Sequence, residues 1–281
     1  MNNPKFSIIT PSYNCAPFLK DCIESVLAQN YENFEHIIVD GASTDNTVEI
    51  LKSYPHLKWI SEPDNGEVEA LNKALKMVTG DILCWLNTDD YILKGAFEEV
   101  LANIDPDRGV HVVYGRTRIL DENDEFSWEK NPRPNMSLAW LVRLWRHHTM
   151  PHQPSMYFTR TVIDTVGEYD AQLTYAIDSE MWMRMRAKFP FKKINKVLSI
   201  ARLERPGAKS QGDVQLQVDA FEEIKRPYFE MLGPFQKASY YLDYAFFHTS
   251  QLLFGRIRYA LKIRTRLQRL RDLILKREYR Y

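Results

Sequence analysis

The sequence predicts an α/β fold in which a parallel sheet carries helices on both faces. Two observations support this prediction. Strand-like and helix-like hydrophobic patterns alternate four times within about the first ninety residues, and each strand-like run ends abruptly in polar or acidic residues. Open sheets of this kind bind ligands at the carboxyl ends of their strands. We therefore expect the polar residues that follow the strands to meet in one crevice.

The first four strands are separated by three helices. The predicted strands cover residues 5–10, 34–39, 57–61 and the apolar run 82–86. Pro17 suits the start of the first helix, because its missing N–H has no partner there anyway. Asp45 or Thr44 can cap the short second helix. Apolar residues at helical spacing from Val68 to Val78 predict the third helix.

The second half has a weaker pattern. We expect a hairpin from residues 110–118 and 126–128, with the polar turn 121–124 between its strands. Residues 155–159 and 193–203 predict two further strands, and Asp178 opens a helix between them. From Val214 onward the pattern is helical throughout.

The stretch Asn87-Thr88-Asp89-Asp90 follows the fourth strand. Its oxygen atoms suit a hard divalent cation such as Mg²⁺ or Mn²⁺, with room left for the phosphate oxygens of a substrate. Taken alone, the same residues also suit a simple turn that caps a helix. Acidic or polar turns at the ends of all four strands favour a binding site over coincidence.

The bulk composition is that of a soluble protein with a sizeable core. The chain has 281 residues, of which 44% are hydrophobic, and its formal net charge is zero. Its three cysteines form no metal-spaced pair, so we expect reduced thiols in a cytosolic protein. We expect no secretory signal, and the apolar segment 244–255 is too short to span a bilayer.

Four motifs together resemble glycosyltransferase family 2, whose members are inverting enzymes of the GT-A fold. The motifs are Ile8-Ile9-Thr10-Pro11-Ser12-Tyr13-Asn14, the stretch Val39 to Thr47, Glu62-Pro63-Asp64-Asn65-Gly66, and Trp85 to Asp90. Their order and spacing match as well as their residues, over roughly residues 5 to 210. The resemblance implies a mixed, Rossmann-like sheet flanked by helices, with a helical extension at the carboxyl end.

The resemblance also implies roles for individual residues. A nucleotide-sugar donor, with UDP the best match, would be bound by Pro11, Tyr13, Asn14, Asp40, Asp45, Asp64, Asn72, Asn87 and Thr88. Asp89, and with less support Asp90, would hold Mg²⁺ or Mn²⁺. Asp178 falls on the position of the catalytic base. His152, Gln153 and Trp182 would line the pocket for the donor sugar or the acceptor, although His152 suits equally a loop histidine bonded to backbone.

A basic loop follows the last strand of the core. We expect Arg202, Arg205, Lys209 and Ser210 to close over a diphosphate, because cations offset its charge and the nearby Gly207 lets backbone approach it. Two departures from the family pattern stand out. The first is Asn87, which stands where the family usually has an aspartate and whose neutral amide brings no charge to the metal. The second is that the basic loop after the last strand lacks the histidine that many relatives have in this loop.

Three histidines, His147, His148 and His152, lie close together in the sequence. Their spacing around Pro151 is not that of a helical ligand pair, and no cysteine is near. We therefore do not expect a zinc site.

The carboxyl-terminal segment is strongly basic. Ten Lys and Arg residues against two acids give residues 256–280 a net charge of +8, which leaves −8 on the remainder. Residues 258–274 form a basic amphipathic pattern that favours an anionic membrane surface over packing on the catalytic domain or on a second copy. We expect no nucleic-acid partner, because the core has no recognisable nucleic-acid module.

These observations give one functional prediction with two alternatives. We expect a catalytic domain in residues 1–212, with a nucleotide-binding half (1–104) and an acceptor half (105–212), followed by the helical extension 213–281. The protein would transfer a sugar to a saccharide acceptor, lipid-linked by analogy, at the cytoplasmic face of the membrane in surface polysaccharide synthesis. The first alternative is an inactive nucleotide-sugar-binding subunit, and the second is a nucleotidyltransferase.

Overall fold

The computed structural model describes residues 3–121, 123–143, 146, 149–202 and 213–249. The chain divides into two compact units, Met1–Met231 and Leu232–Tyr281. In the described part of the second unit, residues 234–249 form a helix. The predicted sites Arg205, Lys209 and Ser210, and the basic segment 256–280, lie outside the described residues.

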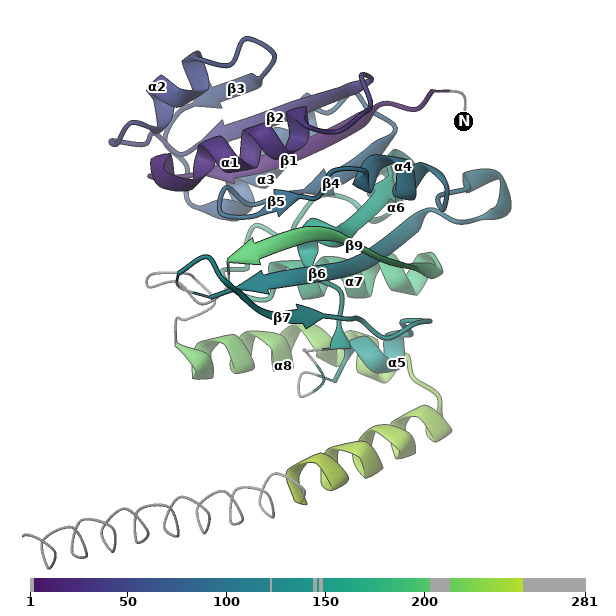
Figure 1. Ribbon diagram of the computed structural model, residues 1–281. Coiled ribbons are helices and arrows are strands. Elements are labelled where there is room, and N and C mark those ends of the chain that lie inside the picture. The colour runs from purple at the N-terminus through teal and green to yellow at the C-terminus, as the bar shows by residue number, and fades with distance from the viewer. Residues whose placement is uncertain (1–2, 122, 144–145, 147–148, 203–212, 250–281) are drawn as a thin grey trace, which may run out of the picture. The chain divides into compact units, whose positions relative to one another are not determined.

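The first unit alternates strands and helices (Figure 1). In chain order its elements are β1 Phe6–Ser12, α1 Ala16–Leu27, β2 Phe34–Asp40, α2 Thr47–Lys52, β3 Lys58–Ser61, α3 Glu67–Met77, β4 Ile82–Trp85, β5 Tyr91–Ile92, α4 Ala96–Leu101, η1 Pro106–Arg108, β6 Val112–Leu120, β7 Phe126–Lys130, α5 Leu138–Leu141, η3 Gln153–Ser155, β8 Met156–Thr159, α6 Arg160–Val166, α7 Ile177–Lys188, β9 Phe191–Arg202 and α8 Val214–Glu230.

One nine-stranded sheet organises this unit, in the order β3-β2-β1-β4-β8-β6-β9-β5, with β7 paired to β6 outside that row. The first four strands are parallel, as the alternating pattern predicts. β8 is antiparallel to both of its neighbours, so the whole sheet is mixed. Ser12 pairs with Asp40, and Asp40 with Ser61, so the carboxyl ends of β1, β2 and β3 meet at one edge.

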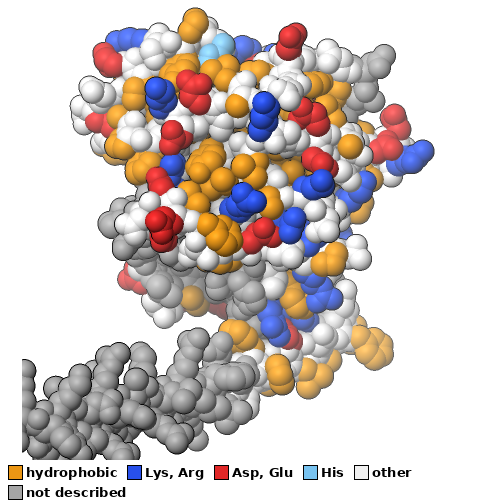
Figure 2. All heavy atoms as spheres, in the orientation of Figure 1, with side chains coloured by type: hydrophobic (Ala, Val, Ile, Leu, Met, Phe, Trp, Pro, Cys, Tyr) orange, Lys and Arg blue, Asp and Glu red, His pale blue; other side chains and the backbone are white. Residues whose placement is uncertain are grey.

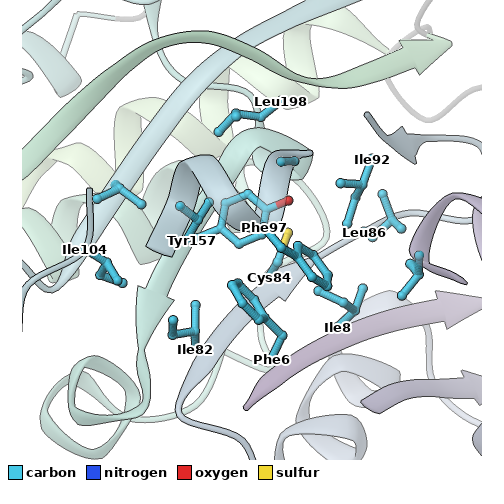
Figure 3. Packing of buried hydrophobic residues seen from close by; sticks show 14 of the residues in the cluster. Phe6, Ile8, Ile82, Cys84, Leu86, Ile92, Phe97, Ile104, Tyr157 and Leu198 are labelled. Atoms are coloured by element: carbon cyan, nitrogen blue, oxygen red, sulfur yellow. The ribbon is translucent and has the colours of Figure 1, made fainter. Parts of the chain in front are cut away.

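Helices cover both faces of the sheet. α1, α2 and α4 lie on one face and α3, α6 and α7 on the other (Figure 1). A hydrophobic core cluster joins β1 and β4 to α1 and α4, and Phe6 stacks on Phe97 with ring centroids 4.1 Å apart (Figure 3). This buried apolar layer fixes the strand ends from which the polar residues project.

Several short elements have no counterpart in the predicted pattern. These are β5, α4, α5 and α6, which have two to seven residues each. Elements this short show less than two periods of hydrophobic alternation, so tertiary packing decides them. α8 contacts α7 directly, since Tyr228 donates a hydrogen bond to Glu180 of α7.

Candidate functional site

The loops after β1 and β2 are locked together by side-chain hydrogen bonds. Asn14, at a left-handed φ of 49°, accepts from the backbone N–H of Thr44 at 2.8 Å, and its own N–H donates to Ser43 Oγ at 2.7 Å. Asp45 Oδ2 accepts from the N–H of Ala16 at the start of α1. The two strand ends therefore form one rigid wall.

Asp40 lies at the centre of this wall and is fully buried. Its Oδ2 accepts hydrogen bonds from the N–H of Ser43 at 2.9 Å and from Ser61 Oγ at 2.7 Å. The carboxylate of Asp64 comes close from the loop after β3, because a Cβ at Gly41 would lie only 2.9 Å from Asp64 Oδ2. Three successive strand ends thus bring two carboxylates to one edge of the sheet.

Asp45 has a second role in this loop. Burial raises its pKa, but hydrogen bonds from Thr47 and Ala16 outweigh burial and leave the pKa below its ordinary value. Asp45 is therefore an ionised anchor of the loop.

The loop after β1 also offers an exposed aromatic ring. Pro11 is half-buried and Tyr13 is 62% exposed, so the Tyr13 ring offers a free face to a planar ligand.

The fourth strand end contributes Asn87 to Asp90. The indole of Trp85 donates to Asn87 Oδ1 at 2.7 Å, and Asn87 Nδ2 donates to Gln153 at 3.4 Å. Thr88 is buried and Asp89 is half-buried. Asp90 is buried, and its Oδ1 accepts from the backbone N–H of Arg202 at 3.3 Å, so this carboxylate helps to hold the end of β9.

Arg202, predicted for the diphosphate loop, is buried in an ion-pair network. Its Nε donates to Asp124 at 2.7 Å and its Nη2 to Asp21 at 2.8 Å, while Nη1 donates to the backbone oxygen of Asp89 at 3.3 Å. Asp124 belongs to the turn between β6 and β7, and Asp21 to α1. Arg202 therefore ties three segments together behind the Asp89 loop, and its donors are already engaged.

Asn72, predicted for the nucleotide site, is engaged elsewhere. Its amide exchanges two hydrogen bonds with the backbone of Tyr169, at 2.8 and 2.9 Å. This pair joins α3 to the loop before α7. Its geometry gives Asn72 a structural role and offers no support for a contact with a nucleotide.

A pocket next to Asn87 contains Asp178. Trp85, Gln153, Tyr169, Asp178 and Trp182 line it together with apolar side chains of β8 and α7. Asp178 lies in the first turn of α7, after Ala176 in a left-handed conformation with φ 56°. The pocket joins the carboxyl end of β4 to the start of α7 and brings together three predicted site residues.

Burial controls the electrostatics of Asp178. Burial raises the pKa of this carboxyl above its ordinary value, while hydrogen bonds from Ser179 and the charge of Lys130 partly oppose the rise. Burial also lowers the pKa of Lys130 to about 8. Lys130 ends β7, and the sequence pattern gave no reason to place it opposite a residue 48 positions later.

Gln153 of η3 lines the pocket, and His152 directly precedes it. Burial, together with the positive charge of Lys130, lowers the pKa of His152 well below its ordinary value, so the imidazole is neutral at pH 7. His152 Nδ1 and Gln153 Nε2 are buried and have no hydrogen-bond partner among the described residues. Buried polar atoms of this kind need a partner, which a hydroxyl-rich ligand can supply.

Residues 7–166, more than half of the chain, match the model of "Glycosyl transferase family 2". The chain belongs to glycosyltransferase family 2. This match confirms the family that the four sequence motifs predicted.

Curated relatives cover the same region. The chain is 28% identical over 203 residues to a chondroitin synthase of Escherichia coli, a match that spans 69% of this chain and 28% of the relative. A hyaluronan synthase of Pasteurella multocida matches at 28% over 203 residues, or 20% of its length. This chain therefore spans less than a third of the length of these synthases.

Solved structures share the fold. The structure of S. aureus TarS 1–349 in complex with UDP-GlcNAc matches with a TM-score of 0.67 and 20% identity, over 88% of this chain and 73% of that chain. A mannosyltransferase of Pyrobaculum calidifontis, in complex with GDP-Man and Mn²⁺, matches with a TM-score of 0.57 and 17% identity, over 90% and 84% of the two chains. The predicted GT-A fold is confirmed.

The described part of the chain contains no helix that is both long and apolar enough to cross a bilayer.

Proposed function

We propose that the chain is an inverting glycosyltransferase that moves a sugar from a UDP-sugar to a hydroxyl group of a saccharide acceptor. The observation that carries the proposal is Asp178, a carboxylate in the wall of the pocket that Trp85, Gln153 and Trp182 also line. Burial raises the pKa of Asp178 above its ordinary value, which suits a general base. The orphaned atoms of His152 and Gln153 are suited to bind sugar hydroxyl groups.

In the proposed reaction, the acceptor oxygen attacks the anomeric carbon from the face opposite the leaving group. Asp178 takes the proton of the acceptor hydroxyl as the new carbon–oxygen bond forms. The bond between the anomeric carbon and the phosphate oxygen breaks, and its electron pair leaves with the nucleoside diphosphate. The Lys130 charge helps to keep Asp178 ionised and ready to accept the proton.

The nucleotide would occupy the edge formed by the first three strand ends, in the half of the catalytic domain within residues 1–104. The exposed ring of Tyr13 would stack on the base, and Asp40 and Asp64 would accept from the base and the ribose. Pro11, Asn14 and Asp45 shape this wall. The UDP-GlcNAc complex of S. aureus TarS, which shares the fold, supports the choice of a UDP-sugar.

A divalent cation fits the donor set around Asp89. The described residues contain no group of three or more His, Cys, Asp or Glu that could hold a metal. Mg²⁺ in nucleotide enzymes uses one or two carboxylates and takes its other ligands from phosphates and water, which suits Asp89 beside Thr88. Bound there, Mg²⁺ or Mn²⁺ would supply Lewis-acid stabilisation of the departing diphosphate.

We further propose that the acceptor half lies within residues 105–212 and that the acceptor is lipid-linked. The segment 256–280, with its charge of +8, would hold the protein on the anionic cytoplasmic face of a membrane. Surface polysaccharide synthesis would place donor, acceptor and enzyme together at that face. Deleting residues 254–281 should release the protein from anionic liposomes, and continued binding would contradict the membrane role.

The central test combines donor binding and chemistry. The purified protein is incubated with Mn²⁺ and a panel of nucleotide sugars, and both the unfolding temperature and the release of nucleoside diphosphate are followed. A donor at 100 times its dissociation constant adds about 2.7 kcal/mol of stability. We expect protection by one donor with slow, metal-dependent hydrolysis.

Two variants sharpen this test. Asp178→Asn should lose at least 100-fold in transfer rate and keep donor protection, because it removes the base and leaves the nucleotide wall intact. Asp164→Asn, an exposed position on α6, is the matched control and should behave as wild type. Transfer by Asp178→Asn at the wild-type rate would exclude Asp178 as the base. Protection without any transfer in wild type would favour an inactive binding subunit.

A further inference from the structure

The stretch from the end of β7 into α6 is basic and free of acids. From Lys130 to Ile163 the sequence contains five Lys and Arg residues and no Asp or Glu, although the whole chain has 37 of each kind. Two parts of this stretch are linked to the pocket. The charge of Lys130 acts on Asp178, and Gln153 lines the pocket wall.

Three arginines of this segment gather around one tryptophan. The guanidinium carbons of Arg133, Arg143 and Arg146 lie 4.1, 5.1 and 5.8 Å from the ring centroid of Trp140. We refer to these four residues as the arginine cluster. Figure 2 shows Lys and Arg side chains grouped over the position that α5, which carries Trp140, has in Figure 1.

Thr149 holds the arginine cluster in place. Its hydroxyl accepts from the Trp140 indole at 2.9 Å and donates to the backbone oxygen of Arg146 at 2.8 Å. Its backbone oxygen accepts from the N–H of Arg133 at 2.9 Å. The arrangement is therefore built by specific bonds and does not depend on flexible side chains that happen to lie near each other.

The cluster is also fixed relative to the catalytic base. Arg186 of α7 donates a hydrogen bond at 2.7 Å to the backbone oxygen of Met136, just before α5. Arg186 follows Asp178 by eight residues, which corresponds to about 12 Å along the helix axis. A ligand that spans both sites must therefore be longer than a single sugar and its hydroxyl groups.

Arg133 is the residue of the arginine cluster whose guanidinium N–H groups are available to bind an anion. Its side chain is exposed and stacks on Trp140, and in the part of the chain that the structure describes its guanidinium makes no hydrogen bond or ion pair. Stacking on an aromatic face fixes the guanidinium plane and leaves its N–H edge available for a bidentate oxyanion. The stretch from Lys130 to Ile163 contains no acid that would oppose such an anion.

We infer that the arginine cluster is an oxyanion site that binds a phosphate or carboxylate group of the acceptor, remote from the hydroxyl that receives the sugar. The inference rests on the proposed transfer function for its substrate, and it narrows the acceptor to an anionic saccharide. A phosphate of a carrier or polyol chain and a carboxylate of a uronic acid share this chemistry. The three arginines then act as a specificity determinant on the loop that connects to the pocket.

The indole N–H of Trp140 provides a local probe for the test. The chain has six tryptophans, so a nitrogen–proton correlation spectrum contains six indole signals, and Trp140→Phe identifies the one that belongs to the cluster. Methyl phosphate, methyl glucuronide and the neutral methyl glucoside are titrated separately, with Mg²⁺ and saturating UDP present to fill the donor site. The titrations are repeated without UDP.

We expect methyl phosphate or methyl glucuronide, but not methyl glucoside, to shift the Trp140 signal saturably, and the shift to weaken with added salt. The anion with the lower half-saturation identifies the source. Arg133→Ala should raise the half-saturation at least tenfold, and Arg133→Lys should restore part of the affinity. Arg108→Ala, an 85% exposed arginine of η1, is the matched control.

Two results would overturn the inference. One is the absence of any saturable shift with either anion, and the other is an unchanged half-saturation in Arg133→Ala with the other indole signals in their wild-type positions. Failure of UDP to protect the protein against unfolding would contradict the proposed function. The anion titrations without UDP would still test the arginine cluster independently. Failure of the proposed function and failure of the anion site can therefore be told apart.

Discussion

Replacing Lys130 by methionine is expected to make the protein more stable and its transfer reaction more sensitive to acid. Burial lowers the pKa of Lys130 from its ordinary value of 10.5 to about 8. Since one pKa unit corresponds to 1.36 kcal/mol, holding the charged amine in the folded state costs about 3.4 kcal/mol at pH 7. The side chain is only partly buried, and solvent screening reduces the expected gain to about 1–3 kcal/mol.

The sign of the pH dependence follows from the same shift. Between pH 8 and 10.5 the unfolded chain keeps the Lys130 proton and the folded chain releases it. Wild-type stability therefore rises with pH across this window as far as Lys130 is concerned, and Lys130→Met lacks that rise. Urea unfolding at pH 7 and at pH 9.5 measures both effects.

The same substitution acts on the proposed base. The Lys130 charge lowers the pKa of Asp178 against the effect of burial, so its removal raises that pKa further. The acid limb of the kcat/KM profile should then move to higher pH, because a smaller fraction of Asp178 is ionised at any given pH. Lys130→Arg, which keeps the charge, should retain the wild-type profile.

A control and a contradicting result complete this prediction. Lys192→Met removes an exposed lysine from β9, whose amine donates to the backbone of Asn103 at 3.0 Å, and should change stability by less than about 0.5 kcal/mol. If Lys130→Met were less stable than wild type at pH 7 and had an unmoved acid limb, the electrostatic account of the pocket would be wrong.

Three further predictions concern metal and stability. Asp89→Asn should abolish the extra thermal protection that Mn²⁺ adds to UDP, and equal protection with and without the carboxylate would place the cation elsewhere. Arg202→Met should cost about 2–3 kcal/mol in urea unfolding, since it leaves two acids unpaired; an unchanged midpoint would show that the network contributes nothing. Glu35→Gln should cost about 3–5 kcal/mol, because this side chain is 3% exposed and bonded to Lys5 and Lys58. The stability due to the Glu35 carboxylate should be present above pH 4.5, its ordinary pKa, and fall as acid protonates it; a flat pH profile of the wild-type minus variant difference would contradict this.

The first half of the site could be predicted from the sequence because parallel strands place successive polar turns at one edge. Asp40 and Asp64 illustrate this, since each follows a strand and their loops meet at Gly41. The prediction used only strand length, alternation and the position of polar residues. None of these depends on how the side chains pack.

The remaining assignments required knowledge of which side chains are already engaged. Asn72 lies within the third helix, and nothing in the local sequence shows that its amide is bonded to the backbone of a residue 97 positions later. In the sequence Lys130 is an ordinary basic residue near the end of a predicted strand, and only the fold shows that its charge acts on Asp178. Contacts between residues far apart in the sequence leave no local pattern, so propensity and periodicity miss them.

Arg202 shows what such contacts mean for the diphosphate loop. The sequence places Arg202 with Arg205, Lys209 and Ser210 in one basic loop. In the structure, however, the three guanidinium nitrogens of Arg202 donate hydrogen bonds to Asp21, Asp124 and the backbone of Asp89. An arginine held in this way positions the Asp89 loop and cannot swing to a substrate without breaking two ion pairs. In the proposed function, neutralising the diphosphate would then fall to a cation at Asp89 and to the basic residues that follow Arg202. Substituting Arg202 should accordingly lower stability and weaken metal binding together, whereas Lys209→Ala should weaken donor binding with no loss of stability. Donor titrations and urea unfolding measure these effects. The opposite pattern would show that Arg202 binds the substrate directly.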